Sequence, residues 1–514
     1  MKKTIIVIAV VFFMLTNFSY IFNTSVSSEE INDDIVINYV FDNLQLEKIS
    51  IGGNEYTEIT IDSDDSFSYT SIPGEPRIPV KGCKIAIPYG KKVESVHVTK
   101  NDPVTFSVDF KIEPSQDVIP IGYDGEISFD MPKEEIYNSD EIYPSIDCEI
   151  VTEQRFRGYN FLVLNLFPVE YRPLTNKLNF YKSLELTIKT STFSNLENID
   201  LNYRGLEKDK ERFKKIIDNP QLVDGKSYPS NQFPTDEVYE YVIITTENLK
   251  NYNQGGYNLH DLADAKTNVG LNTKIMTVEE IGNGYSGTST QEKIRNFIKY
   301  AYNNWQTDYV LIAGDTGLVP TKNVYVQDPK WPKNVPCDLY YACLDSDAPD
   351  GSYECDLTAE VYVGRAPVDN TQEVTNFVKK TLDYMDTNDD YIYSALWIAE
   401  DIQRGIGHGK ELIKQSIGHC EDDGYITNGL PEGNGEYEYD LERLWVGYCP
   451  QGYANSKLSS GNYHLINYIG HSNTNLCIGM SSSTAKNLGN DNYFFLYAQS
   501  CLLFHLVLEY TWEP

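Results

Sequence analysis

Positive charge is what this sequence lacks most. Its 42 Lys and Arg residues stand against 75 Asp and Glu residues, which leaves a formal net charge of −33. Phosphate recognition needs clustered cations and anionic lipid attracts basic segments, so this charge excludes a general nucleic-acid binder and argues against docking on anionic membranes. Cysteine is scarce as well. Nine cysteines in 514 residues are too few for a disulfide scaffold, and an odd number leaves one thiol over if the others pair.

Long hydrophobic runs are absent after the first residues. Lys2 and Lys3 precede an apolar run over residues 4–15, and a polar stretch with small residues follows up to Ser27. This is typical of a secretory signal peptide, here residues 1–27. An uncleaved anchor is the alternative, but twelve helical residues span only about 18 Å of a bilayer core of about 30 Å. We expect an exported protein, secreted or held at the cell surface, with no membrane contact beyond this segment.

Amphipathic helices are missing from residues 28–195. Apolar and polar residues alternate instead, for example over residues 93–98 and 184–188, with turns such as residues 73–76 between them. The pattern predicts an all-β, sandwich-like domain. Residues 196–236 then carry a charge run of both signs at 207–212 and turn residues at 227–231. We expect a linker there, with a short helix around 212–217 and a candidate processing site at Lys214 and Lys215; a plain solvated connector is the alternative.

From residue 237 onward, apolar strands alternate with helices. The expected helices begin at Ser289, followed by Glu292, and at Asn370, followed by Glu373. The expected strands are residues 242–245, 309–313, 361–363, 395–399, 464–469 and 493–497. Continuous apolar strands separated by helices predict an α/β domain with a mostly parallel sheet, in which reactive groups collect beyond the carboxyl ends of the strands.

Two of these strand ends carry residues of complementary chemistry. Strand 464–469 runs into Gly470 and His471, and strand 493–497 runs toward Cys501. If the two strands are neighbours, an imidazole stands beside a thiol, which is what cysteine peptidase chemistry needs for thiolate formation and for protonation of the leaving amine. The main-chain N–H groups of Ser472 and Cys501 are then candidate oxyanion-hole donors. The alternative is a His and a Cys that merely end two strands.

The same residues resemble the gingipain family of cysteine peptidases, which share a caspase-like fold. Residues 468–472 are similar to the segment of the catalytic histidine, and residues 499–501 are similar to that of the nucleophile. Further similar segments are residues 309–315, 338–341, 360–365 and 370–385 in the second half, and 74–79, 87–90 and 167–173 in the β-rich front. The resemblance covers residues 31–501.

The resemblance implies a zymogen. Residues 28–195 would be an inhibitory propeptide domain, and residues 237–514 a caspase-like cysteine peptidase domain. The family orients its histidine with an acid placed soon after a strand such as 395–399; Glu400 and Asp401 both stand there, and the choice between them stays open. The family's basic-residue specificity does not transfer, because residues 404–408 supply no obvious acidic counterpart.

The C-terminus departs from the family pattern. An apolar run follows Cys501, and the sequence ends 13 residues later at Pro514, which predicts a truncated or frame-shifted end and puts activity in doubt. An acidic loop with Asp345, Asp347 and Asp350 is a weak calcium candidate, although Pro349 interrupts a helix-loop-helix calcium pattern. We expect no required cofactor and no other metal.

The sequence thus predicts a secreted cysteine endopeptidase. It is expected to act on protein or peptide substrates through Cys501 and His471 by way of a thioester, with its own propeptide as intramolecular inhibitor. One alternative is a catalytically inactive, truncated relative or a surface-binding protein. Another is an esterase that uses the same two residues.

Overall fold

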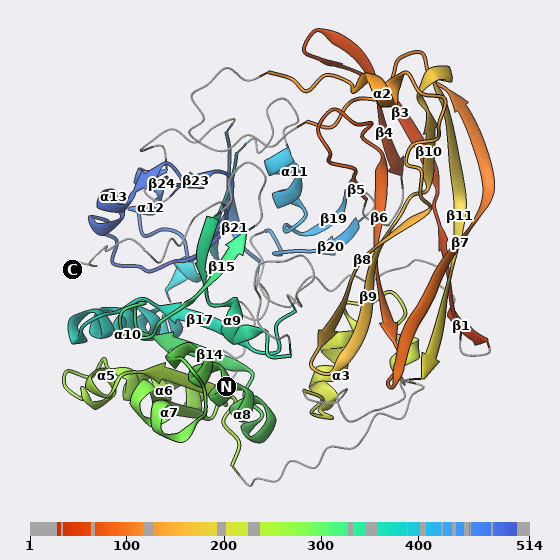
Figure 1. Ribbon diagram of the computed structural model, residues 1–514. Coiled ribbons are helices and arrows are strands. Elements are labelled where there is room, and N and C mark those ends of the chain that lie inside the picture. Colours follow the sequence, from red (N-terminus) through yellow and green to blue (C-terminus); the bar gives the residue numbers. More distant parts are fainter. Residues whose placement is uncertain are drawn as a thin grey trace.

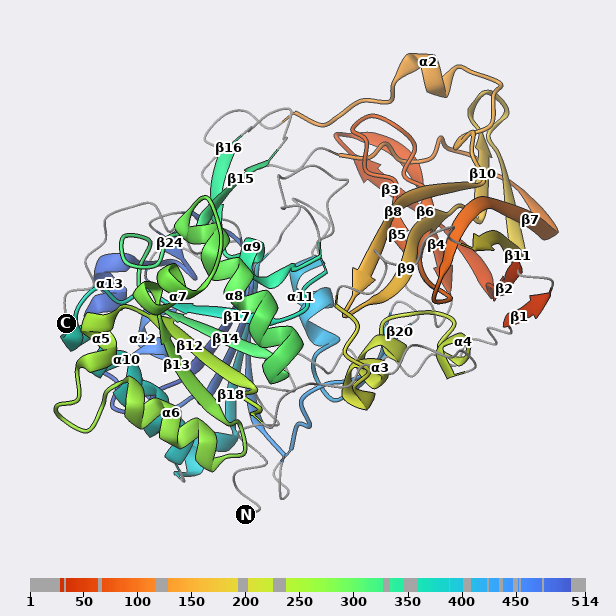
Figure 2. The same ribbon diagram turned by 60° about the horizontal axis from the view of Figure 1, so that its bottom comes forward.

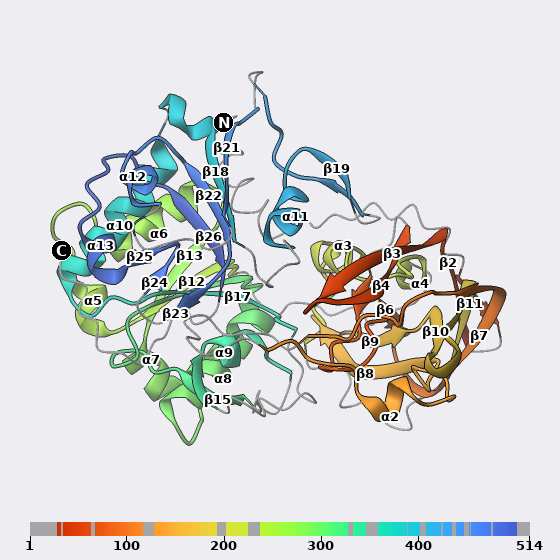
Figure 3. The ribbon, with the colours of Figure 1, turned by 90° about the horizontal axis from the view of Figure 1, so that it is seen from above.

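The structure is a computed structural model with two lobes side by side, a β-rich lobe and an α/β lobe (Figures 1 and 3). It describes residues 28–31, 34–62, 67–116, 128–192, 202–224, 237–326, 333–345, 358–387, 389–400, 408–422, 425–433, 438–446, 452, 454–473 and 476–500. The expected signal peptide, Asp401 and Cys501 lie outside the described residues. No described helix is long and apolar enough to cross a membrane.

The β-rich lobe contains antiparallel strands and two short helical turns. Its strands are β1 (Ser28–Ile31), β2 (Asp34–Val40), β3 (Asn43–Ile51), β4 (Asn54–Asp62), β5 (Ser68–Tyr69), β6 (Pro79–Ile87), β7 (Lys91–Ser107), β8 (Cys148–Phe156), β9 (Tyr159–Leu166), β10 (Val169–Arg172) and β11 (Lys177–Thr192). The turns are α2 (Glu134–Tyr137) and η1 (Pro173–Thr175). One sheet has the order β1-β2-β11-β10, with β7 also on β11, and another has the order β5-β6-β9-β8.

One hydrophobic core joins these two sheets. Strand β11 buries Leu184, Leu186 and Ile188, and strand β9 buries Leu162 and Leu164 in the same cluster. Buried residues two apart on each strand are what a strand with one face toward the core requires, because its side chains alternate between faces. The β-rich domain predicted from alternation is therefore present.

The segment expected as a linker is folded over residues 202–224. It contains α3 (Glu207–Lys214) and α4 (Gln221–Asp224), and α3 lies at the base of β8 and β9 on the side that faces the α/β lobe (Figures 1 and 2). Phe213, Ile217 and Val223 are buried in one cluster with Tyr159 and Phe161 of β9. This part of the expected linker packs as a portion of the β-rich lobe, and Lys214 lies in the last turn of α3.

The first half of the α/β lobe holds a four-stranded parallel sheet. Its strands are β12 (Tyr241–Thr245), β13 (Thr273–Thr277), β14 (Tyr309–Ala313) and β17 (Tyr362–Ala366), in the order β13-β12-β14-β17. The associated helices are α5 (Glu247–Asn251), α6 (Leu259–Asn268), α7 (Val278–Gly284), α8 (Thr290–Trp305), α9 (Leu339–Ala342) and α10 (Thr371–Asp386). A separate hairpin joins β15 (Lys322–Val326) and β16 (Lys333–Cys337). Helices α7 and α8 cover one core of this sheet and α6 and α10 the other.

The second half repeats this arrangement. Strands β18 (Ser394–Glu400), β21 (Asp440–Val446), β22 (Leu465–Ile469) and β26 (Phe495–Gln499) form a parallel sheet in the order β21-β18-β22-β26. Around it lie η2 (Asp390–Tyr393), α11 (His408–Lys414), β19 (His419–Asp422), β20 (Tyr425–Asn428), α12 (Asn455–Leu458), β23 (Ser472–Asn473), β24 (Leu476–Cys477), β25 (Met480–Ser481) and α13 (Ser482–Lys486). The sequence predicted one mostly parallel sheet, whereas the described strands form two, because an apolar pattern does not show which strands pair.

The two predicted helix starts are confirmed, but the glutamate of each differs from a full capping box in the N–H group that it accepts. Ser289 caps α8 by accepting the main-chain N–H of Glu292 at 3.2 Å, and Asn370 caps α10 in the same way. In a full capping box the acid three residues later would accept from the cap residue's own N–H. Glu292 and Glu373 instead accept the N–H of the residue before the cap.

Candidate active site

The two strands whose ends carry the predicted site are neighbours. Strand β22 lies between β18 and β26, and Ile469 stands opposite both Ala399 and Gln499 in parallel register. The chain segments that leave these three strands therefore emerge at one edge of the sheet. This edge also contains a topological switch point, which lies between β18 and β22. After β18, the next strand of the chain, β21, pairs on one side of β18, and β22 pairs on its other side. Ligands of parallel sheets bind at such points.

Gly470 allows the chain to pass close to its neighbours at this edge. Its N–H donates to the carbonyl oxygen of Gln499 at 3.2 Å, which carries the pairing of β22 and β26 one residue further. A Cβ atom at this position would stand 2.7 Å from the Tyr468 hydroxyl and 2.9 Å from Cδ of Glu400. A side chain would therefore collide with Glu400 and Tyr468, so the position requires glycine.

Glu400 is the buried carboxylate of the site, with 2% of its surface exposed. Its Oε1 accepts a hydrogen bond from the Tyr468 hydroxyl at 2.8 Å, and its Oε2 lies 3.3 Å from the main-chain N–H of His471, which donates to it. The Tyr468 hydroxyl is also 2.5 Å from the carbonyl oxygen of His471. Glu400 and Tyr468 together hold both main-chain polar groups of His471.

This arrangement concerns the choice between Glu400 and Asp401 as the acid that orients His471. Glu400 and Asp401 were equal candidates to orient His471 through its ring. The hydrogen bond from His471 that the structure describes for Glu400 comes from the main chain, so Glu400 positions the segment that carries the imidazole. Asp401 and Cys501 lie outside the described residues, and their roles stay predictions.

His471 is half-buried at the end of β22, and the chain turns away directly after it. Ser472, which is 3% exposed, begins the short strand β23, where it pairs with Cys477 of β24. Strand β25 adds to this ribbon through Met480 and Ser481. The ribbon fixes the direction in which the chain leaves His471. The expected oxyanion role of the Ser472 N–H stays a prediction, because it requires the position of Cys501.

Tyr468 is a residue for which sequence reasoning found no role. It was recognised only as part of a similar segment, although the strand pattern could have identified it, since a tyrosine at a buried strand position must find a hydrogen-bond partner. His464, at the other end of β22, is a core residue. It stacks on Tyr384 with ring centroids 4.2 Å apart, and burial lowers the pKa of its imidazole to about 4.

The described residues contain no group of three or more His, Cys, Asp or Glu side chains that could hold a metal ion. Of the calcium candidates, Asp345 follows α9 and is half-buried, whereas Asp347 and Asp350 lie outside the described residues. The calcium site therefore stays a prediction.

Comparison with known proteins identifies two family models along the chain. The model of peptidase family C25 matches residues 234–506, and the model named Propeptide_C25 matches residues 22–216. The second match extends through α3, in keeping with the packing of that helix on the β-rich lobe.

Among curated proteins, two relatives come from Porphyromonas gingivalis. Gingipain R2 is 22% identical over 379 residues, which are 71% of this chain and 45% of the relative. Gingipain R1 is 22% identical over 381 residues, which are 71% of this chain and 34% of the relative. The chain thus spans less than half the length of these relatives.

Solved structures give weaker similarity. The complex of Porphyromonas gingivalis RgpB pro- and mature domains has a TM-score of 0.32 at 17% identity, covering 39% of this chain and 99% of the other. The Arg-specific cysteine proteinase gingipain R (RGPB) has a TM-score of 0.37 at 17% identity, covering 55% of this chain and 58% of the other.

Proposed function

Because this chain belongs to peptidase family C25, as a gingipain-type cysteine peptidase with a C25 propeptide, we propose that it is made as an exported zymogen that cleaves peptide bonds through Cys501 and His471. Its substrates are proteins or peptides. Its fold is a caspase-like α/β domain preceded by a sandwich-like β propeptide, with the propeptide as intramolecular inhibitor.

The observation that carries the proposal is the pairing of β22 with β26. Because the two strands are parallel neighbours in register, the segment of His471 and the segment that leads to Cys501 leave the same edge of the sheet. Glu400 and Tyr468 hold the main chain of His471 at that edge. A histidine beside the end of a strand that leads to a cysteine is the arrangement that thiol activation requires.

The proposed mechanism has two stages. The Cys501 thiolate attacks the scissile carbonyl carbon, the N–H groups of Ser472 and Cys501 stabilise the oxyanion, and His471 protonates the departing amine as the thioester forms. His471 then takes a proton from water, whose oxygen attacks the thioester and releases the acid and the thiolate. Each oxyanion donor contributes about 3–4 kcal/mol in enzymes where it has been removed. No cofactor takes part.

The test compares peptide cleavage by full-length chains that differ in one thiol. Cys501→Ala removes the nucleophile, so cleavage should fall to background. Cys148→Ala is the matched control, because it removes a half-buried thiol of β8 and should leave cleavage unchanged. Cleavage that persists in Cys501→Ala, or that is lost equally in both variants, would overturn the proposal. Mass spectrometry of the exported chain tests the expected N-terminus after residue 27.

A further inference from the structure

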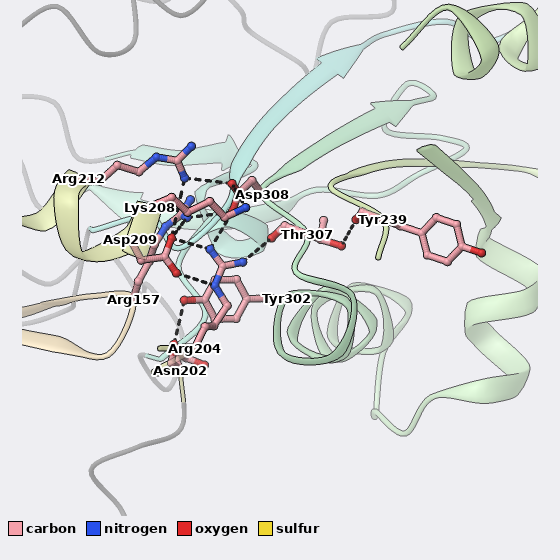
Figure 4. Close-up of polar contacts among 10 residues, drawn as sticks. All are labelled: Arg157, Asn202, Arg204, Lys208, Asp209, Arg212, Tyr239, Tyr302, Thr307 and Asp308. Atoms are coloured by element: carbon pink, nitrogen blue, oxygen red, sulfur yellow. Dashed lines mark hydrogen bonds and ion pairs between the residues drawn. The ribbon is translucent and has the colours of Figure 1, made fainter. Parts of the chain in front are cut away.

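A buried charge cluster lies where the two lobes meet, at the amino end of β14 (Figure 4). Asp308, the residue before β14, is its carboxylate from the α/β lobe. Arg157 comes from the turn between β8 and β9, which we call the hairpin tip. Arg204 comes from residues 202–206, which we call the connector, and α3 supplies Lys208, Asp209 and Arg212. The cluster thus joins three segments that are far apart in the sequence.

Four cations surround Asp308, whose side chain is 3% exposed. Its Oδ1 accepts from Arg157 Nη1 at 2.9 Å and from Arg204 Nη2 at 2.7 Å. Its Oδ2 lies 3.0 Å from Arg212 Nη1 and 2.9 Å from Lys208 Nζ. Burial alone would raise the pKa of Asp308, but these four charges hold it well below its usual value. Asp308 therefore stays ionised.

The residues of the cluster that precede Lys214 belong to the propeptide side, and they supply four cations but one carboxylate, Asp209. Asp209 accepts from Arg204 Nε at 2.8 Å and also from Arg157 Nη1. The side chains of Arg157 and Arg204 are both 0% exposed, so neither charge is relieved by water. Without Asp308, the two buried guanidinium groups of Arg157 and Arg204 would have Asp209 as their one carboxylate among the described contacts. Unpaired buried charge is costly, so the propeptide side depends on the α/β lobe for neutralisation.

Close packing and neutral hydrogen bonds fix the same contact. Gly158 adopts a φ of +83°, and a Cβ atom on it would stand 2.5 Å from Cα of Tyr203, so the hairpin tip is pressed against the connector. The Tyr302 hydroxyl of α8 donates to the carbonyl oxygen of Asn202 at 2.8 Å. Arg204 stacks over the Tyr302 ring at 4.1 Å and donates to the carbonyl oxygen of Thr307 at 3.2 Å.

The four cations that contact Asp308 would all stay with the propeptide after the chain is cut. All four precede Lys214, so a cut after that residue, or anywhere in residues 225–236, leaves every one of them on the propeptide fragment. Asp308 stands at the amino end of a strand in the first sheet, whereas His471 follows the carboxyl end of a strand in the second. Contact at Asp308 therefore uses none of the proposed catalytic residues.

We propose that Asp308, Tyr302 and the carbonyl of Thr307 form a docking site, the Asp308 socket, that holds this chain's own hairpin tip and connector and keeps the propeptide bound after the chain is cut. The proposal rests on the zymogen function proposed above. It makes release of the propeptide a separate step from cleavage, set by the lifetime of a buried ionic contact.

The experiment uses the full chain with Cys501→Ala, so that no self-processing occurs, and with the recognition sequence of a site-specific protease placed within residues 225–236. After the cut, gel filtration over a range of concentrations gives the dissociation constant of the two fragments. The fragments of the parent chain should elute together. Asp308→Asn should raise the dissociation constant about 100-fold or more, because it removes one of the two carboxylates that neutralise the buried Arg157 and Arg204.

A pair of double variants keeps the test decisive if Asp308→Asn fails to fold. Lys208→Gln with Arg212→Gln removes the two partly exposed cations that contact Asp308 and should raise the dissociation constant about tenfold. Lys210→Gln with Lys214→Gln removes the same charge from the same helix, but these lysines pair with Asp224, so the constant should not change. Equal constants for the two double variants would overturn the proposal. Because binding is the readout, a failure of the peptidase proposal would appear only in the Cys501→Ala cleavage assay.

Discussion

The two parallel sheets of the α/β lobe share one strand order and differ in what stands at their carboxyl ends. In each sheet the first strand of the chain lies between the second and the third, and the fourth lies at the edge. The topology therefore offers two switch points, one between β12 and β14 and one between β18 and β22. Since the backbone arrangement is repeated, the difference in chemistry comes from a few side chains.

An ion pair lies at the first edge, which is the carboxyl end of the sheet of β12, β13, β14 and β17; the second edge is the carboxyl end of the other sheet. Arg365 of β17 donates to both carboxylate oxygens of Asp338 at 2.7 Å, and to the carbonyl oxygens of Gly314 and Val319. At the second edge, the described contacts of Glu400 come from a hydroxyl and a main-chain N–H. The guanidinium–carboxylate pair fixes structure at the first edge, whereas the described contacts of Glu400 at the second edge hold the main chain of His471.

The largest expected effect is on stability at the first edge. Asp338→Ala leaves the guanidinium of Arg365, whose side chain is 5% exposed, without its carboxylate, and should lower the free energy of unfolding by about 3–5 kcal/mol. Guanidinium chloride unfolding followed by tryptophan fluorescence measures this change. Glu432→Gln breaks the exposed pair with Arg443 and should cost less than about 1 kcal/mol. A cost for Asp338→Ala as small as that of Glu432→Gln would contradict a structural role.

The next effect is a difference in acid sensitivity. Burial lowers the pKa of His464 to about 4, below the ordinary value of about 6.5, so the folded state prefers the neutral ring. Its contribution is present above about pH 6.5 and is lost as the pH falls toward 4, with a total of about 3 kcal/mol. His464→Phe keeps a ring beside Tyr384 and Tyr391 but cannot titrate. Unfolding measured between pH 7 and 4 should show a smaller loss for the variant. Parallel curves would contradict the assignment.

At the second edge the expected effect is on rate. Glu400→Gln removes the charge while keeping the shape, and should lower kcat/KM about 100-fold, because a reacting group displaced by about 1 Å loses about that much rate. Asp315→Asn is the matched control, because Asp315 follows β14 as the chain leaves the first sheet and caps a turn through the N–H groups of Gly317 and Leu318. It should leave kcat/KM unchanged within threefold. Similar losses in both variants would remove the distinction between the two edges.

The smallest effect belongs to Tyr468. Tyr468→Phe deletes the hydroxyl that contacts Glu400 and the carbonyl oxygen of His471, and should lower kcat/KM about tenfold, equivalent to about 1.4 kcal/mol. Tyr463→Phe, which deletes a hydroxyl bonded to Glu442, is the control and should not change the rate. If the two variants have equal rates, Tyr468 does not position the histidine.

The sequence predicted six of the eight described parallel strands of the α/β lobe, because a buried parallel strand is largely apolar. Strands β13 and β21 were not predicted, because charged residues interrupt their apolar pattern. Residues 309–313 were expected as a strand and form β14 with the same bounds. Ser289 and Asn370 marked helix starts because a short polar side chain satisfies the first N–H groups. The division into two sheets could not be predicted, since pairing depends on contacts between distant segments.

The segment of residues 202–224 contains a contact that the sequence pattern could not predict. The charge run at residues 207–212 has the same composition whether it is solvated or buried, so it was interpreted as a linker. Its cations contact Asp308, about a hundred residues further along the chain, and no local pattern reports such a partner. The role of Tyr468 was missed for a similar reason, because its partner Glu400 lies on another strand.

The most direct measurement for the peptidase assignment follows one thiol and one activity in the same sample. The chain, cut and freed of its propeptide, is treated with iodoacetamide near pH 7, and alkylation of Cys501 is measured by mass spectrometry alongside peptide cleavage. Cys501 should react faster than the other thiols, because a nearby imidazole favours its thiolate, and cleavage should fall in proportion to its alkylation. Cleavage that continues after Cys501 is fully alkylated, or a propeptide-free chain that cleaves no peptide, would contradict the assignment.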